Sequence, residues 1–285
     1  MVRTIDRMVE VPLEVSGART KQWLTDGNSL WLYKLNKDVI ECVTESLSSK
    51  VAIKLGIPHV DCHLVTRNGV LGTMSKGILT GVEGSMLLPF GKLVKTNMGW
   101  VVTPSNNWTQ APIGYTKHLI VTTLHDLKGE GLQIERFFVI AMLFDFLISN
   151  RDRHHNNWSV IVDFDGNYSR CPLYDSGFSL RSDKEDGTLL KWLENKQHFP
   201  SASLNLGSKV NKNETERTFG SLIKDIKESH PNELKWFKAA LRDKLTPEVI
   251  ELLVKDISGK LISEIRIKYM ERLLKANREY LLKKV

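Results

Sequence analysis

A segment that is apolar on nearly every side, Ile134 to Ser149, constrains the fold of this chain most. A helix with hydrophobic residues all round its circumference has to be buried in the core of a domain. It is followed directly by a polar loop, Asn150-Arg151-Asp152-Arg153-His154-His155-Asn156-Asn157. A polar loop that follows a buried helix has a rigid base, which is the placement that catalytic side chains require. The pattern therefore predicts a functional loop at residues 150–157.

Three oxygen-bearing side chains stand out in and after this loop. Asp152 and Asn157 are five residues apart, and Asp175 ends the later run Pro172-Leu173-Tyr174-Asp175. Phosphoryl transfer from ATP needs one carboxylate to direct a hydroxyl, and an Asn and a second carboxylate to hold Mg²⁺. Mg²⁺ prefers oxygen ligands and usually takes one or two carboxylates beside phosphates and water. Each residue type is also common in turns, but their combination and order favour Asp152 as general base and Asn157 and Asp175 as Mg²⁺ ligands.

Other polar residues extend this candidate site. His154 is interpreted first as a brace for the loop backbone, with a catalytic acid as the alternative. Lys34 ends a short apolar strand, from which a cation can reach the α- and β-phosphates of ATP; a strand-end lysine that extends to solvent is the alternative. Glu41 and Glu45 lie on one face of the next predicted helix. We expect Glu45 to pair with Lys34, and the pattern does not exclude Glu41.

Patterns along the chain indicate strands first and helices later. Short apolar or alternating runs predict strands at residues 9–15, 29–35 and 61–67. A helix is predicted over residues 38–55, where Gly56 and Pro58 would end it. Residues 86–129 contain scattered Gly, Pro and Asn and are predicted to be irregular. Later patterns predict strands at residues 158–162 and 168–174. From about residue 217 to the end the chain is predicted to be helical.

The order of these elements predicts an α+β fold with two lobes. Residues 1–80 would form a small β-rich lobe that holds a phosphate loop, the Lys34 strand and one helix. Residues 81–285 would form a hinge region and a larger, mainly helical lobe with the catalytic and metal-binding loops.

Composition favours a cytoplasmic protein. A chain of 285 residues can bury the core of one large domain or two lobes. No apolar run reaches the ~18 residues that suggest a membrane span, and the first residues lack the apolar core of a signal peptide. Cys42, Cys62 and Cys171 are isolated, which favours a reducing compartment and argues against a zinc site or disulfide framework.

The net charge of +7 raises the question of a nucleic-acid partner. The basic residues, however, are spread through the chain and concentrated towards its C-terminal end. A solvated, mildly basic helix face accounts for this distribution better than a nucleic-acid surface does. We therefore expect neither direct nucleic-acid binding nor a membrane partner.

The loop at residues 150–157, taken with Pro172-Leu173-Tyr174-Asp175, resembles the catalytic and metal-binding motifs of HipA-like serine/threonine kinases. The resemblance implies ATP and Mg²⁺ as cofactors and a two-lobed fold related to protein kinases and phosphoinositide kinases. Gly17-Ala18-Arg19-Thr20-Lys21 is similar to the phosphate loop of this family, and Trp31-Leu32-Tyr33-Lys34-Leu35 to the strand that carries its ATP-contacting lysine. The resemblance also assigns the helix glutamate to Glu45 and places nucleotide contacts at Met74, Ser75 and Lys76.

The chain resembles the short, stand-alone members of this family, because it begins almost at the phosphate loop whereas longer HipA proteins have a further N-terminal subdomain. The antitoxin partner, DNA complex and protein target of the longer proteins are therefore not carried over. We expect a Ser/Thr protein kinase with an unidentified protein substrate, and a toxin or effector role is compatible with this. Self-phosphorylation at Ser16 or Thr20 is a further expectation, because phosphate in that loop would repel ATP.

Two alternatives stay open. A phosphoinositide-type lipid kinase is one, since D-R-H-x-x-N also occurs in that related fold, although the P-x-Y-D segment and the lack of a membrane-binding element favour a protein substrate. An ATP-binding pseudokinase that serves as an interaction module is the other. It is disfavoured because Lys34, Asp152, Asn157 and Asp175 are all present.

Overall fold

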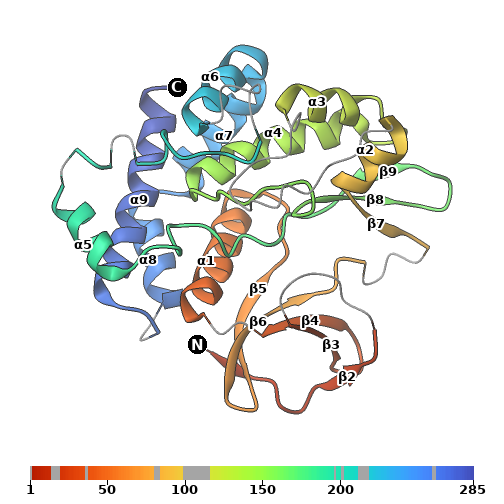
Figure 1. The fold of residues 1–285 in the computed structure, drawn as a ribbon, viewed down its shortest axis with the longest axis horizontal. Helices are drawn as coiled ribbons and strands as arrows, with labels where there is room; N and C mark the ends of the chain where they lie inside the picture. The colour runs from red at the N-terminus through yellow and green to blue at the C-terminus, as the bar shows by residue number, and fades with distance from the viewer. Residues whose placement is uncertain are drawn as a thin grey trace.

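The structure is a computed structural model of the chain, and it describes residues 2–13, 20–35, 38–79, 84–98, 116–195, 197–199, 202–210, 218–258 and 261–285. A curled β-sheet from the N-terminal part lies at one end and a group of helices from the C-terminal part at the other, with helix α1 between them (Figure 1). This arrangement confirms the predicted α+β fold.

The N-terminal sheet has six strands in the spatial order β1-β5-β6-β4-β3-β2. All neighbouring pairs are antiparallel except β1 and β5, which are parallel. Its strands are β1 (Arg3–Thr4), β2 (Val9–Val11), β3 (Lys21–Thr25), β4 (Leu30–Leu35), β5 (Cys62–Arg67) and β6 (Val70–Lys76). The sequence pattern predicted strands at the places of β2, β4 and β5, but not at those of β1, β3 and β6.

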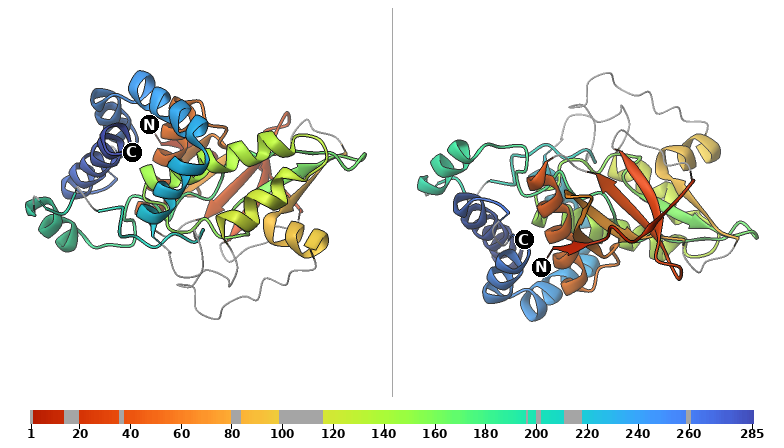
Figure 2. Two further views of the ribbon diagram at one scale, coloured as in Figure 1. Left: turned by 90° about the horizontal axis from the view of Figure 1, so that it is seen from above. Right: turned by 90° about the horizontal axis from the view of Figure 1, so that it is seen from below.

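Helix α1 (Val39–Leu55) has the ends that the sequence predicts. Asp38 is its N-cap, and the Asp38 side chain accepts a hydrogen bond from Ile40 N. Gly56 ends it with φ of 81°, a left-handed conformation in which a glycine avoids the steric penalty of a Cβ atom. The helix contacts β5 and β6 on one side and α7 and α8 on the other (Figure 2). A residue of α1 can therefore connect the sheet to the helical part.

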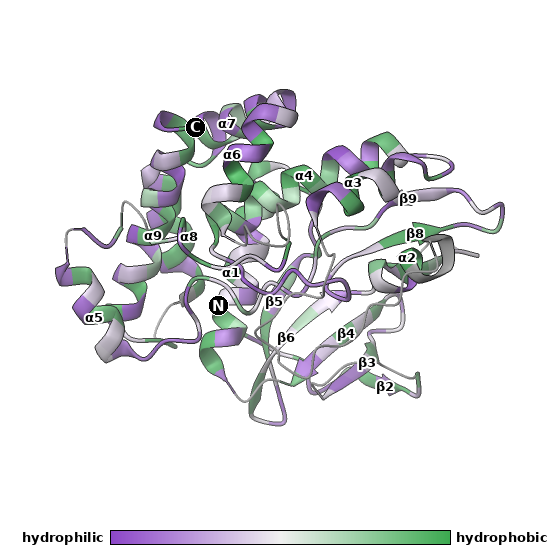
Figure 3. Cartoon of the chain, turned by 45° about the horizontal axis from the view of Figure 1, so that its top comes forward, coloured by the Kyte–Doolittle hydropathy of each residue, from purple (hydrophilic) through white to green (hydrophobic). Residues whose placement is uncertain are grey.

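Helix α4 (Gly131–Leu147) forms the centre of the helical part. Most of its side chains are buried, and Figure 3 shows it largely in the hydrophobic colours. It packs against α3, α6, α7 and α9, so the prediction of a buried helix before the polar loop is confirmed. The helices that follow it along the chain are α5 (Asp186–Glu194), α6 (Phe219–Ser229), α7 (Pro231–Lys244), α8 (Pro247–Ser258) and α9 (Glu264–Lys283).

The segment from residue 86 to residue 129 is more regular than predicted. It contains β7 (Met86–Pro89), α2 (Phe90–Met98) and α3 (Lys117–His125) among its described residues. Strand β7 pairs with β8 (Ser159–Val162), which pairs with β9 (Tyr168–Arg170), in a second antiparallel sheet. Short elements such as β7 take their order from distant partners, here the 159–162 strand, and so their local sequence predicts them poorly.

Among the described residues, no helix has the length and apolar character needed to span a membrane.

Candidate active site

Lys34 joins the sheet, α1 and the segment after β9 through its ammonium group. Its Nζ lies 2.6 Å from Glu45 Oε1 and 3.0 Å from Asp175 Oδ1. Burial alone would lower the pKa of Lys34, but the two carboxylates outweigh burial and raise it. The ammonium group therefore remains charged and bridges residues that are 11 and 141 positions away in the sequence.

The choice between Glu41 and Glu45 is settled by this geometry. Glu45 is buried, pairs with Lys34, and accepts a hydrogen bond of 3.2 Å from Thr73 Oγ1 on β6. Glu41 instead lies against Gly177, where a Cβ atom would come within 2.9 Å of Glu41 Cγ. The absence of a side chain at Gly177 thus allows the segment after Asp175 to approach α1 closely. Thr44 Oγ1 fixes that approach with a 2.6 Å hydrogen bond to the Gly177 carbonyl.

Asp152 and Asn157 are held together inside the polar loop. Asn157 Nδ2 donates to the Asp152 carbonyl at 2.8 Å and to Asp152 Oδ2 at 3.1 Å. Burial, and then the nearby carboxylate of Asp175, raise the pKa of Asp152 to about 6. A carboxyl with that pKa can accept a proton from a substrate hydroxyl near neutral pH, as a general base must.

Asp175 differs from Asp152 in its electrostatics and its backbone. Burial would raise its pKa, but Lys34, Lys21 and Arg153 oppose this and hold the pKa of Asp175 below its usual value. Its backbone has φ of 58°, an uncommon conformation for a residue with a side chain. Asp175 is thus ionised at neutral pH, in a conformation that the surrounding structure has to maintain.

The donor set fits a Mg²⁺ ion beside a nucleotide. Both N–H groups of the Asn157 amide are directed to Asp152, and among the described residues its Oδ1 accepts no hydrogen bond. Asn157 Oδ1 and the ionised Asp175 carboxylate supply the oxygen ligands that Mg²⁺ prefers, and phosphates and water usually complete its shell. The described residues contain no group of three or more His, Cys, Asp and Glu side chains that would hold a metal ion by themselves.

The sequence interpretation assigned no role to Arg153 or His155, and the structure gives a place to Arg153. It is almost fully buried and binds Asp145 on α4 through Nε at 2.9 Å and Nη2 at 3.0 Å. Its Nη1 donates to the carbonyls of Asn157 at 2.7 Å and Tyr174 at 2.9 Å. Arg153 therefore holds the two candidate metal-binding segments in fixed positions on α4. The signal in the sequence was a single Asp within an apolar helix, since a buried carboxylate needs a cation.

His154 has the geometry of a brace. Its Nδ1 accepts a 3.1 Å hydrogen bond from the Asn156 backbone N–H, and its Nε2 lies 3.9 Å from Asp152 Oδ2. Burial lowers the pKa of His154 below its usual value. At neutral pH the ring is therefore uncharged, which supports the bracing interpretation over an imidazolium acid.

The structure describes only some of the residues of the predicted phosphate loop. Thr20 and Lys21 precede and begin β3, and the Thr20 carbonyl accepts a 3.0 Å hydrogen bond from Leu35 N. Burial and the Lys34 cation lower the pKa of Lys21, while Asp175 acts in the opposite direction. Lys21 is thus within electrostatic range of the same carboxylate that Lys34 contacts. Gly17, Ala18 and Arg19, with Ser16 before them, lie outside the described residues.

The three residues predicted to contact the nucleotide on β6 do not share one face of the sheet. Lys34 pairs with Thr73 across the β4–β6 ladder, and Tyr33 pairs with Met74. Because side chains alternate along a strand, Ser75 shares the face of Lys34, whereas Met74 and Lys76 lie on the opposite face. Met74 is buried there with Tyr33. A nucleotide beside Lys34 would meet those two residues only through their backbone.

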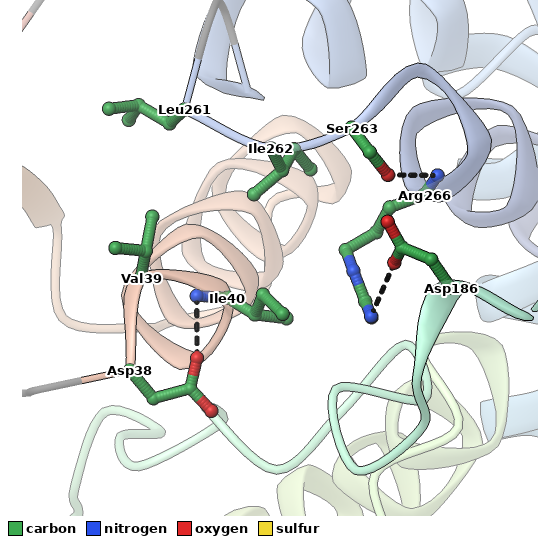
Figure 4. Close-up of a pocket in the computed structure, with 8 residues that line it drawn as sticks. All are labelled: Asp38, Val39, Ile40, Asp186, Leu261, Ile262, Ser263 and Arg266. Carbon is green, nitrogen blue, oxygen red and sulfur yellow. Dashed lines mark hydrogen bonds and ion pairs between the residues drawn. The ribbon is translucent and has the colours of Figure 1, made fainter.

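A cavity of about 580 Å³ lies at the N-terminal end of α1, and neither Lys34 nor Asp152 is among the residues that line it (Figure 4). It is lined by side chains of α1, α5 and the start of α9. Arg266 projects from α9 into this region, where its Nη2 binds Asp186 Oδ1 at 2.8 Å and the Lys184 carbonyl at 2.6 Å. Arg266 thereby fixes the chain between Asp175 and α5 to the last helix.

Comparisons with known proteins support a kinase fold. No protein-family model matches the chain, and no curated protein matches it significantly. The crystal structure of the Helicobacter pylori proinflammatory kinase CtkA is similar, with a TM-score of 0.79 and 16% sequence identity over 99% of this chain and 96% of that one. The structure of the Shewanella oneidensis HipA–HipB toxin–antitoxin complex with operator DNA is similar with a TM-score of 0.59 and 13% identity, over 96% of this chain and 67% of that one. At these identities the similarity is one of fold, and the chain has the α+β kinase fold of the HipA-like proteins.

Proposed function

We propose that the chain is an ATP- and Mg²⁺-dependent kinase that transfers the γ-phosphoryl group to serine or threonine hydroxyls of a protein. The observation that carries this proposal is the contact of Lys34 with both Glu45 and Asp175, with Asp152 within electrostatic range of Asp175. Phosphoryl transfer depends mainly on positioning and charge neutralisation, and these residues supply both. Serine and threonine are proposed as acceptors because the loop motif resembles that of HipA-like serine/threonine kinases.

In this proposal each residue has one task. Lys34, held by Glu45, binds the α- and β-phosphates, and Asn157 and Asp175 hold Mg²⁺. Asp152 orients the substrate hydroxyl and takes its proton as the hydroxyl oxygen bonds to the γ-phosphorus and the bond from that phosphorus to the leaving oxygen of ADP breaks. When bound, ATP supplies the phosphoryl group and Mg²⁺ neutralises its charge.

The test is transfer of labelled phosphate from ATP, with the protein alone and with a cell lysate, followed by identification of the labelled proteins. Asp152→Ala should lose transfer but still bind ATP, because Asp152 is assigned no nucleotide contact. Asp165→Ala is the matched control, since Asp165 is exposed in the turn between β8 and β9. Full activity of Asp152→Ala would refute the assignment, and labelling of lipid vesicles but of no protein would refute the substrate class.

Self-phosphorylation belongs to the same proposal. Thr20 is exposed at the start of β3, and Lys21 next to it lies within electrostatic range of Asp175. Intact-mass measurement after incubation with ATP and Mg²⁺ should show added phosphate that peptide mapping places at Ser16 or Thr20. Phosphate found only at distant residues would count against this part.

A further inference from the structure

Two arginines, one in the polar loop and one after Asp175, converge on a single carboxylate. Arg151 directly precedes Asp152, and Arg181 lies in the segment after Asp175. Arg151 Nη1 is 3.7 Å from Asp183 Oδ2, and Arg181 Nε is 3.6 Å from Asp183 Oδ1. Lys184 Nζ is closer, at 2.9 Å. One carboxylate therefore faces three cations.

The carboxylate does not satisfy the two guanidinium groups. Both arginine separations exceed the roughly 2.7–3.2 Å of an ordinary N–H···O hydrogen bond. The Nε atoms of Arg151 and Arg181 are buried and have no hydrogen-bond partner among the described residues, and Arg181 as a whole is only 8% exposed. A buried donor that loses water and gains no acceptor is destabilising. The pair is thus built for an acceptor larger than the Asp183 side chain.

The surrounding structure fixes this pair in place. The guanidinium carbon of Arg181 lies 4.7 Å from the centre of the Trp192 ring, in a cation–π contact. Leu180 N donates to the Ile148 carbonyl at 2.8 Å, which ties the segment to the end of α4, just before Arg151. Arg266 holds the Lys184 carbonyl from the other side. A pre-organised pair loses little conformational entropy when it binds a ligand.

The charge around the pair is positive. Arg151, Arg181 and Lys184 face Asp183, and Lys209 lies within electrostatic range of both Asp152 and Arg151. Burial would raise the pKa of Asp183, but the neighbouring cations outweigh it and lower that pKa. The segment has two further carboxylates, Glu185, which is exposed, and Asp186, which is paired with Arg266. The positive charge of these side chains therefore favours the binding of an anionic group close to Asp152.

We propose that Arg151 and Arg181 bind a phosphate group on a side chain of the protein substrate, so that the enzyme prefers proteins already phosphorylated near the acceptor hydroxyl. The preference for such substrates rests on the proposed function, whereas the phosphate site itself does not. A phosphate has three free oxygens and nearly two negative charges, and guanidinium groups match that geometry with paired hydrogen bonds. In the structure the Asp183 side chain faces both guanidinium groups, and a bound phosphate takes the place of that side chain.

Binding is tested with two peptides, acetyl-Gly-Gly-phosphoserine-Gly-Gly-amide and its serine counterpart. The nucleotide site is first saturated with Mg²⁺ and a non-hydrolysable ATP analogue, so that the peptide phosphate cannot bind there. Titration calorimetry should show at least about ten-fold tighter binding of the phosphopeptide, because charge-assisted hydrogen bonds are strong. Equal affinity for the two peptides would overturn the proposal.

Variants locate the phosphate on the molecule. Arg151→Gln and Arg181→Lys should each weaken phosphopeptide binding about ten-fold, whereas Asp183→Ala should strengthen it because a competing anion is removed. Asp183→Ala keeps the test informative if an arginine variant fails to fold. Arg170→Gln is the matched control, since Arg170 is an exposed arginine paired with Glu130 in the 168–170 strand. An equal loss in Arg170→Gln and Arg151→Gln would show a general charge effect and refute the site.

Transfer assays then separate this inference from the proposed function. Substrate peptides with phosphoserine near the acceptor serine should have a higher kcat/KM than those with serine, and Arg151→Gln should bring that ratio towards one. Phosphopeptide binding without transfer to any peptide would support the phosphate site but refute the proposed kinase activity. Equal kcat/KM for peptides with and without phosphoserine would support the kinase activity but refute the preference for phosphorylated substrates. If phosphate added to this chain itself blocks phosphopeptide binding, the site serves its own phosphorylated residue, and the substrate preference is overturned.

Discussion

Lys34 is the residue whose charge most directly connects the parts of the candidate site. We predict that Lys34→Met lowers phosphoryl transfer by at least about 100-fold, because it removes the cation assigned to the phosphates and leaves Glu45 and Asp175 without it. Initial rates with labelled ATP measure the effect. Lys54→Met is the matched control, since Lys54 is an exposed lysine on α1. A Lys34 variant as active as the Lys54 variant would contradict the assignment.

Asp152 should make stability depend on pH in an identifiable direction. Its pKa is about 6 in the folded protein and near 3.8 in an unfolded chain, so the folded state binds more protons between these values. Ionisation of Asp152 therefore destabilises the fold as pH rises through this range. Asn cannot ionise, so Asp152→Asn should have a higher Tm than the wild type at pH 7.5 and a smaller difference at pH 5. An equal difference at both pH values would contradict this.

The carboxyl group of Asp152 should also control how kcat/KM depends on pH. The pH dependence of kcat/KM reports the pKa of an essential base in the free enzyme. We expect kcat/KM of the wild type to rise with pH through about 6 and then level off, because only ionised Asp152 accepts the hydroxyl proton. A profile that is flat between pH 5 and pH 8 would exclude Asp152 as the base.

At the scale of elements, Arg153 connects α4 to both segments that carry the candidate metal ligands. We predict that Arg153→Met lowers the free energy of unfolding by about 3–5 kcal/mol, because the buried Asp145 loses its counter-ion. Urea denaturation measures the change. Arg170→Met, an exposed arginine, should stay within about 0.5 kcal/mol of the wild type.

The double variant Asp145→Asn/Arg153→Met distinguishes the cause. If the loss comes from an unpaired buried carboxylate, removing that charge as well should recover part of the stability. A double variant that is as unstable as the sum of the two single variants would instead show that Arg153 acts through packing alone.

The sequence predicted some elements well and others not at all, for identifiable reasons. Helix α1 was predicted within a residue or so because Asp38 and Gly56 are local capping signals. Helix α4 was predicted because burial on all sides is visible in its composition. Strand β7 and helices α2 and α3 were missed. In that segment tertiary packing decides the structure, since Phe90 stacks on the distant Trp158 with ring centres 4.2 Å apart.

For the whole molecule, we predict that a non-hydrolysable ATP analogue with Mg²⁺ raises the Tm of the wild type. Ligand at about 100 times its Kd should stabilise the folded state by about 2.7 kcal/mol. Asp175→Ala should lose the part of this gain that depends on Mg²⁺, because its carboxylate is the assigned metal ligand. Thermal denaturation with and without Mg²⁺ measures both. A Mg²⁺-dependent gain that is equal in Asp175→Ala would exclude this ligand.

The sequence carried more information about the candidate site than about the elements that surround it. The order and spacing of Asp152, Asn157 and Asp175 predicted a phosphoryl-transfer site, and the contact of Asp175 with Lys34 across 141 positions is what the fold contributes. The sequence favoured Glu45 but did not exclude Glu41, because both lie on one helix face and the direction of α1 against the sheet selects between them. It also did not assign Arg153, whose partners come from three separate segments.

If the proposed function holds, the hydrogen bond of Lys34 to Asp175 makes nucleotide and metal cooperative ligands. In this structure the ammonium group and the carboxylate neutralise each other at 3.0 Å. In the proposed function, phosphates draw Lys34 away and release Asp175 for Mg²⁺, and Mg²⁺ in turn releases Lys34 for phosphates. Each ligand should therefore lower the dissociation constant of the other by the same factor, as thermodynamic reciprocity requires. Without ligands, the enzyme would thus keep the ion pair of Lys34 and Asp175, and this pair would separate fully only when nucleotide and Mg²⁺ are both bound.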